Sequence, residues 1–238
     1  MKEDTDNLQF DNLKPVLNEK PTYWRLTIPT SEAAQTEELV LSMQGVIVNK
    51  DLPPMLTNRP NEQHQPFIRQ SVQLTGFNCK EFQTCINTLQ QLHQTFSRQM
   101  PEGNMEPLTL GQFRHFDTVE FATHYFTSRR DDPNGTEMPF DQSTDPNGVL
   151  ARLASNKKYF HGEDNKVLYY ILKHANNESL PRFFEVDPAQ FRVGDIVEVQ
   201  ITVAAVPIKN NKFKMISQLR CLALLDGTFT DVSILYQN

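Results

Sequence analysis

Four cationic side chains follow one another near the C-terminal end of the chain. They are Lys209, Lys212, Lys214 and Arg220. No Asp or Glu occurs between Glu198 and Asp226. Because side chains alternate along a strand, three of the four cations are expected on one face. Such a basic face on a twisted hairpin can follow a phosphate backbone, although edge-strand lysines also prevent aggregation, so both roles stay open.

Basic and aromatic side chains interleave in a second short segment. Lys157, Lys158, Tyr159 and Phe160 place two cations beside two rings, and Arg129-Arg130 adds a further basic pair upstream. Proteins that bind single strands combine cations for the phosphates with rings on which bases stack. Together the two segments predict nucleic-acid binding, single-stranded or of low sequence specificity, through a basic β-hairpin.

A metal site is a second kind of chemistry to weigh. His115 and Asp117 have the spacing of a two-His-one-carboxylate iron site, with His161 or His174 as the distant ligand. This pattern would suit a metal-dependent oxygenase, but it is common by chance and no phosphate-binding glycine motif or nucleophile elbow accompanies it. We therefore expect no cofactor and a binding protein rather than an enzyme.

A third reading is a non-catalytic interaction or assembly module. Apolar strand edges would then pair between subunits, giving a homo-oligomer. This alternative assigns no particular residue to a site. The sequence is compatible with it as well as with nucleic-acid binding.

The charge is unevenly distributed along the chain. The net charge is -6, with 12 Lys and Arg against 20 Asp and Glu in residues 1–150, and 11 against 9 in residues 151–238. An acidic first part argues against a protein that binds polyanions over its whole surface. A local basic strip in the second part remains compatible with such a partner.

Cysteine usage and hydropathy indicate an intracellular protein of the nucleus or cytoplasm. Three cysteines (Cys79, Cys85 and Cys221) are too few and too irregularly spaced for a disulfide framework or a zinc ribbon. No apolar run is long enough to span a membrane, and the N-terminal residues lack the apolar region of a signal peptide. We expect no membrane partner.

Hydrophobic periodicity predicts an α+β fold, mainly antiparallel β. Alternating or apolar runs predict strands over residues 23–28, 38–48, 70–77, 113–126, 165–174, 196–207 and 213–225, with a last short strand over 229–236. Helix remains an alternative for 113–126. Apolar residues at helical spacing between Phe82 and Phe96 predict one amphipathic helix, which Asn78 and Glu81 would cap, and 149–154 suits a short helix. The expected sheet is barrel-like or strongly twisted, with the long helix packed on it.

Composition divides the chain into four parts. Residues 1–20 are expected to be a mobile acidic tail, 21–128 an N-terminal α+β part, and 149–238 a C-terminal β-rich part that can form one domain with 21–128. Between them, residues 129–148 contain the tetrapeptide Asp-Pro-Asn-Gly twice, which favours type I turns in a long loop. Residues 175–190 are expected to be a second loop.

Two resemblances bear on the C-terminal part. The phrase Phe191–Gln200 resembles the entry into OB-like small β-barrels, in which a Gly-Asp turn leads into a long strand. The turn at 145–148, the phrases 161–169 and 194–200, and the ending 224–229 are similar to an uncharacterised multicopy protein family of mushroom-forming fungi. That resemblance implies a multicopy protein, with association to mobile elements as one option. It implies no activity, so no site residue follows from it.

Overall fold

The computed structural model describes residue 10 and residues 13–29, 36–56, 62–174 and 180–228. The last strand expected over 229–236 lies outside these residues, as do most of the first twelve residues. The other expected strands are all found. Residues 113–126 form strands rather than the alternative helix.

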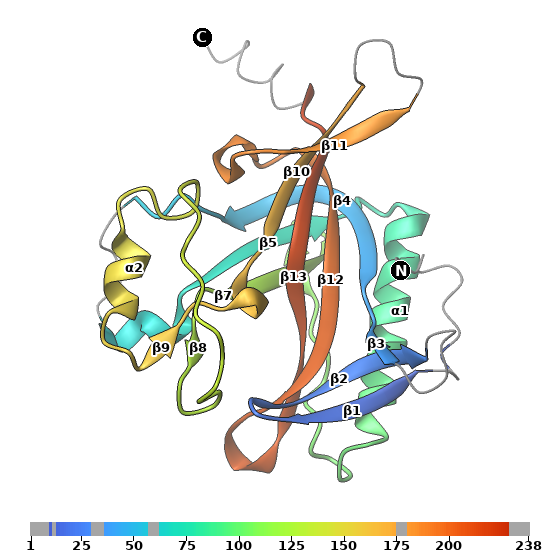
Figure 1. Cartoon of the computed structure of the whole chain (residues 1–238). Coiled ribbons are helices and arrows are strands. Elements are labelled where there is room, and N and C mark those ends of the chain that lie inside the picture. Colours follow the sequence, from blue (N-terminus) through green and yellow to red (C-terminus); the bar gives the residue numbers. More distant parts are fainter. Residues whose placement is uncertain (1–9, 11–12, 30–35, 57–61, 175–179, 229–238) are drawn as a thin grey trace.

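One large mixed sheet organises the molecule (Figure 1). Its main path runs in the order β11-β10-β13-β12-β4-β5-β7-β6, and β2 joins it by pairing with β12 while also pairing with β1 and β3. The strands are β1 Lys14–Glu19, β2 Thr22–Pro29, β3 Thr36–Glu38, β4 Leu41–Asp51, β5 Arg69–Thr75, β6 Gly111–Phe113, β7 Phe116–His124, β10 Leu168–His174, β11 Pro181–Glu185, β12 Ile196–Pro207 and β13 Phe213–Asp226. All pairs are antiparallel except β10 with β13. The predicted α+β class, mainly antiparallel β, is confirmed.

The sheet is strongly twisted but not closed into a barrel, because β11 and β6 end its main path without pairing to each other. It nevertheless curls until β7 meets β13, where the Thr123 hydroxyl donates a 2.6 Å hydrogen bond to the Leu219 carbonyl. Pairing of β12 with β4 also joins residues 149–238 to residues 21–128 in one sheet. The candidate site lies beside the contact between β7 and β13.

The β12–β13 hairpin is the longest element of the sheet. Its inward side chains in β12, including Val197, Val199 and Val203, are almost fully buried, as the alternation predicts. The turn is a one-turn 3-10 helix, η6 (Lys209–Asn211), in which Asn210 and Asn211 both have positive φ. Asn tolerates this conformation, so the Asn-Asn pair explains where the hairpin reverses.

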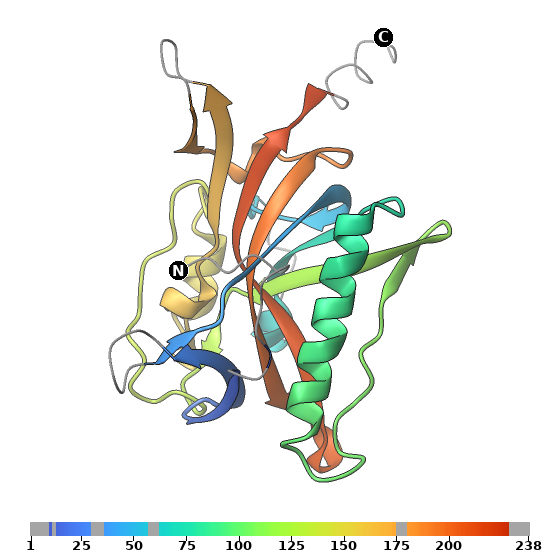
Figure 2. The same ribbon diagram turned by 90° about the vertical axis from the view of Figure 1, so that its right-hand side faces the viewer.

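One long helix, α1 (Lys80–Ser97), packs beside β4 (Figure 2). Its apolar stripe from Phe82 to Phe96 is buried, which confirms the predicted amphipathic helix. The predicted capping box is wrong: the helix begins one residue later, after Cys79, which makes no side-chain cap. The helix approaches so closely that a Cβ on Gly76 would lie 2.2 Å from the Phe82 Cβ.

A smaller unit covers one side of the sheet. It contains the two-stranded pair β8 (Thr127–Ser128) with β9 (Tyr159–Phe160), the short helix α2 (Val149–Ala154) and the 3-10 helix η4 (Glu163–Asn165). Residues 129–148 form neither helix nor strand, as expected. The loop is nonetheless tied down, because the Arg129 guanidinium lies 3.9 Å from the Phe160 ring centroid and also donates to the Gly135 carbonyl.

Two expectations for loops and tails differ from the structure. Within the expected N-terminal tail, Lys14–Glu19 forms β1, because pairing with β2 supplies hydrogen bonds that the polar sequence does not reveal. Within the expected loop at 175–190, Pro181–Glu185 forms β11 by pairing with β10, and Pro188–Gln190 forms the 3-10 helix η5. Another 3-10 helix, η3 (Glu62–Phe67), lies in the connection between β4 and β5. Short strands with one proline lack a recognisable alternation of apolar and polar residues. Whether they form therefore depends on pairing with a neighbouring strand.

Candidate nucleic-acid interface

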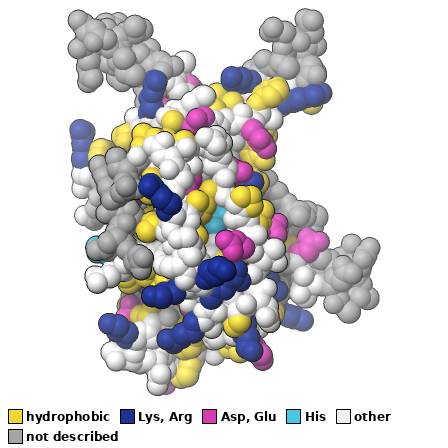
Figure 3. Space-filling model, turned by 60° about the vertical axis from the view of Figure 1, so that its left-hand side comes forward, with side chains coloured by type: hydrophobic (Ala, Val, Ile, Leu, Met, Phe, Trp, Pro, Cys, Tyr) yellow, Lys and Arg dark blue, Asp and Glu magenta, His cyan; other side chains and the backbone are white. Residues whose placement is uncertain are grey.

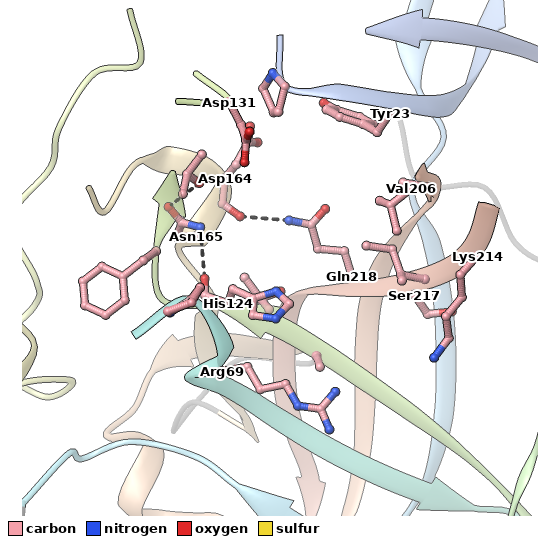
Figure 4. A pocket seen from close by; sticks show the side chains of 18 of the residues that line it. Tyr23, Arg69, His124, Asp131, Asp164, Asn165, Val206, Lys214, Ser217 and Gln218 are labelled. Atoms are coloured by element: carbon pink, nitrogen blue, oxygen red, sulfur yellow. Dashed lines mark hydrogen bonds between the residues drawn. The ribbon is translucent and has the colours of Figure 1, made fainter. Parts of the chain in front are cut away.

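An open groove of about 1530 Å³ lies beside the contact between β7 and β13. Its hairpin wall consists of Ala204, Val206 and residues 214–218, and its loop wall consists of residues 126–132, 158–160 and 162–165. Strands β5 and β7 form the floor, and the turn between β1 and β2 closes one end. Figure 4 shows Val206, Lys214 and Ser217 on one side, Asp131 and Asn165 on the other, and Arg69 below.

Two lysines of the sequence prediction line this groove. Lys214 belongs to the hairpin wall and Lys158 to the loop wall, and both are exposed. Among the ion pairs of the described residues, none involves either ammonium group. Tyr159, also predicted, lines the groove while packing against the small apolar cluster beneath the loop wall. Lys157 is exposed beside it but is not part of the lining.

The groove contains carboxylates as well as cations. Its five cations are Arg69, Arg129, Arg130, Lys158 and Lys214, and its six carboxylates are Glu106, Glu120, Asp131, Asp132, Glu163 and Asp164. Four of these carboxylates have basic partners within 4.0 Å, namely Arg69 for Glu120, Arg130 for Asp131, Lys212 for Glu106 and Arg220 for Asp164. Figure 3 shows one face of the molecule, on which several Lys and Arg side chains gather in the lower half and carboxylates lie among and above them.

Arg220 has a different position from the one the sequence suggested. Its side chain is only 21% exposed, and its guanidinium lies 3.3 Å from an Asp164 carboxylate oxygen and 3.6 Å from a Glu38 carboxylate oxygen. It also donates to the Asp164 carbonyl at 3.1 Å and to the Thr202 hydroxyl at 3.2 Å. We call this set of contacts the Arg220 clasp. It ties β13 to η4 and β3, and so fixes the loop wall to the sheet.

The remaining predicted cations lie at the hairpin tip, outside the groove lining. Lys209 is exposed in η6, and the Lys212 ammonium lies 3.8 Å from the Glu106 carboxylate. Backbone hydrogen bonds of 2.8 Å join Phe213 to Asn104 and to Glu106, which fixes the tip against the preceding loop. The basic strip of the sequence is therefore divided among the groove, the clasp and the tip.

The sequence reasoning missed several groove residues, among them Tyr23, Arg69 and His124. Burial raises the pKa of the Tyr23 hydroxyl, and Asp164 and Glu38 add to that effect. More than a third of the His124 surface is exposed, yet partial desolvation and the nearby Arg69 guanidinium lower its pKa below the ordinary value. No sequence pattern around these residues identifies them as groove residues, because their strands come close to β13 only in the folded sheet.

The three weak metal candidates do not come together. His115 is exposed at the turn between β6 and β7, with its ring centroid 4.0 Å from that of Phe116, and Asp117 follows it on β7. His161 is buried, with Nδ1 2.9 Å from the Tyr125 carbonyl oxygen, and its ring stacks on Phe140. The described residues contain no group of three metal-binding side chains, and the His174 side chain lies outside them.

The polar turn after His161 has a structural role. Asn165 is buried, accepts a hydrogen bond from the Gly162 backbone and donates one of 3.0 Å to the His124 carbonyl. Burial also lowers the pKa of His161. These contacts hold the loop wall in place beside the floor.

Comparison with known proteins gives no family for the chain. No protein-family model matches it, and no curated protein matches it significantly. Within the described part of the chain, no helix has the length and apolarity needed to cross a membrane.

Proposed function

We propose that the groove binds single-stranded nucleic acid with low sequence specificity. The observation that carries this proposal is that Lys158 and Lys214 line one groove from two different walls, and that Tyr23 and Tyr159 line it too. Cations without ion pairs among the described residues supply phosphate contacts, and the half-buried tyrosine rings supply stacking surfaces for bases. Both kinds of contact are those that single strands require.

The charge of the groove favours a single strand over a duplex. Six carboxylates line it, and the whole chain carries a net charge of -6. A duplex has about one negative charge per 1.7 Å of its axis, so it would meet more repulsion here than a single strand with half that charge density. In a duplex the bases are stacked on one another, so they could not also stack on the half-buried aromatic side chains.

We expect low sequence specificity because the side-chain amides that line the groove already make hydrogen bonds within the protein. The Gln73 amide donates to the Thr118 hydroxyl at 2.6 Å, and the Gln218 amide donates to the Asp164 carbonyl at 3.0 Å. Asn165 is similarly engaged with backbone groups. Amides that would read base edges are thus already bonded, whereas stacking and phosphate contacts tolerate any base.

The experiment is a fluorescence-anisotropy titration of a labelled oligonucleotide of about 12 nucleotides, single-stranded or duplex, at low salt. Lys158→Glu combined with Lys214→Glu should weaken single-strand binding by roughly a hundredfold, since two attractive contacts become repulsive. Lys80→Glu is the matched control, because Lys80 is exposed at the start of α1, outside the groove, and a carboxylate is tolerated there. It should bind as the wild type does.

Two results would overturn the proposal. One is wild-type protein that retains no single strand at low salt. The other is a double variant whose affinity equals that of the Lys80→Glu control. Preferential binding of the duplex would reject the single-strand assignment while leaving the groove as the site.

A further inference from the structure

The end strand β11 presents an unusual edge. Phe183 and Phe184 are 51% and 43% exposed, and all five residues of the strand are exposed. Natural proteins normally protect such an edge, and β11 has part of this protection, because it is short and contains Pro181 and two charged residues. In the described residues β11 pairs only with β10, so its other side is an open row of backbone groups beside two exposed aromatic rings.

The direction of these backbone groups follows from the register. Tyr170 pairs with Glu185 and Leu172 with Phe183, and the Val186 N–H donates to the Tyr169 carbonyl just beyond. Opposed residues in an antiparallel ladder alternate between hydrogen-bonded and non-hydrogen-bonded pairs. The N–H groups of Phe183 and Glu185 therefore point away from β10, as do their carbonyl groups.

We propose that β11 pairs antiparallel with β11 of a second copy of this chain, about a two-fold axis at Phe183. Only outward-facing residues can exchange hydrogen bonds across such an interface. Full overlap of the five residues places Phe183 opposite Phe183, Arg182 opposite Phe184 and Pro181 opposite Glu185. Pro181 has no N–H, but its carbonyl accepts from the outward N–H of Glu185 in the other copy.

The chemistry of these pairs is compatible with self-association. No two like charges are opposed, and an aromatic pair at the centre of an antiparallel interface is among the favourable cross-strand pairs. Pairing of strand edges gives affinity through main-chain hydrogen bonds, and an interface of one short strand is small, so the dimer should be weak and concentration-dependent. This inference is independent of the groove, whose lining contains no residue of β11.

The first test is sedimentation velocity from low micromolar to several hundred micromolar protein. The wild type should shift from monomer to dimer across this range. Phe183→Pro should stay monomeric, because it removes the central outward donor without removing a hydrogen bond to β10. Phe183→Leu keeps both the donor and the apolar surface and should still dimerise.

The second test is disulfide trapping, performed in a Cys79→Ser background because Cys79 is exposed. In the proposed register the two Phe183 Cα atoms lie about 5.5 Å apart, a distance that a disulfide can span. Phe183→Cys should therefore form a covalent dimer under mild oxidation. Glu185→Cys is the control, since its two copies would lie about 13 Å apart along the strands.

A wild type that remains monomeric at every concentration would overturn the proposal, as would equal cross-linking of Phe183→Cys and Glu185→Cys. A Phe183→Pro variant that dimerises like the wild type would exclude β11 as the interface. Binding of a short oligonucleotide should be the same in all β11 variants that fold, so failure here is distinguishable from failure of the groove.

Discussion

Strand β13 carries Lys214 near its beginning and Arg220 further along, and the two cations have different surroundings. Lys214 is exposed, pairs across the hairpin with Val206, and faces the groove beside apolar and neutral neighbours. Arg220 is mostly buried between Asp164 and Glu38. The same strand thus carries one cation that has no ion pair among the described residues, and another that holds the walls of the groove together.

The difference shows that partners, rather than residue type alone, determine what a basic side chain does. The planar guanidinium of Arg220 meets a carbonyl, a hydroxyl and two carboxylates at once, which a lysine ammonium could not arrange in the same geometry. Lys214 has no such convergence of acceptors among the described residues. Its charge is therefore not neutralised by any carboxylate of the described residues.

The largest expected effect is on stability. Arg220→Ala leaves the half-buried Glu38 carboxylate without its guanidinium partner and should lower the free energy of unfolding by about 2 kcal/mol. Lys214→Ala should change it by less than about 0.5 kcal/mol, because an exposed side chain without an ion pair contributes little. Urea denaturation of both variants measures the difference. Equal destabilisation would remove the distinction between the two cations.

A smaller effect should appear in the pH dependence of stability. Burial raises the pKa of Glu38, and the Arg220 and Arg25 guanidinium groups offset this only in part. A raised folded-state pKa means that protonation favours folding, so the wild type should lose stability relative to Glu38→Gln as pH rises from below 4.5 through the raised value. Urea midpoints of both proteins at about pH 4 and about pH 7 test this. If the urea midpoint of the wild type instead rose relative to that of Glu38→Gln with increasing pH, this prediction would be contradicted.

The smallest effect concerns the groove floor. Desolvation and the Arg69 guanidinium lower the pKa of His124, so its imidazole is neutral at pH 7. A bound phosphate would favour the protonated form, and single-strand affinity should rise a few-fold between about pH 7.5 and about pH 5.5. His124→Gln should flatten this rise. His93→Gln is the control, since that other groove imidazole already contacts the Glu106 carbonyl oxygen at 2.7 Å. An unchanged profile in His124→Gln would show that the ligand does not approach the floor.

Much of the fold could be predicted from the sequence, because alternation is visible wherever a strand has one buried face. It located β12, β13 and the turn at Asn210-Asn211. It did not find β11 or β1, whose few residues are ordered by pairing with neighbours rather than by their own pattern. The parallel pairing of β10 with β13 also leaves no local trace.

The candidate site could be predicted only in part, for a related reason. Lys158, Tyr159 and Lys214 were recognisable as basic and aromatic residues within short segments. The role of Arg220 was not, because Glu38 and Asp164 are distant in the sequence and reach it only through the folded sheet. Local charge patterns show which cations exist, whereas tertiary contacts decide which of them remain free.

The different roles of Lys214 and Arg220 on β13 are tested most directly by the salt dependence of single-stranded nucleic-acid binding. Each phosphate contact contributes about 0.7 to the slope of the logarithm of the binding constant against the logarithm of salt concentration. Lys158→Gln combined with Lys214→Gln should therefore reduce the wild-type slope by about 1.4, without lowering the urea midpoint. A slope equal to that of the wild type would show that these two lysines do not contact phosphates and would contradict the account.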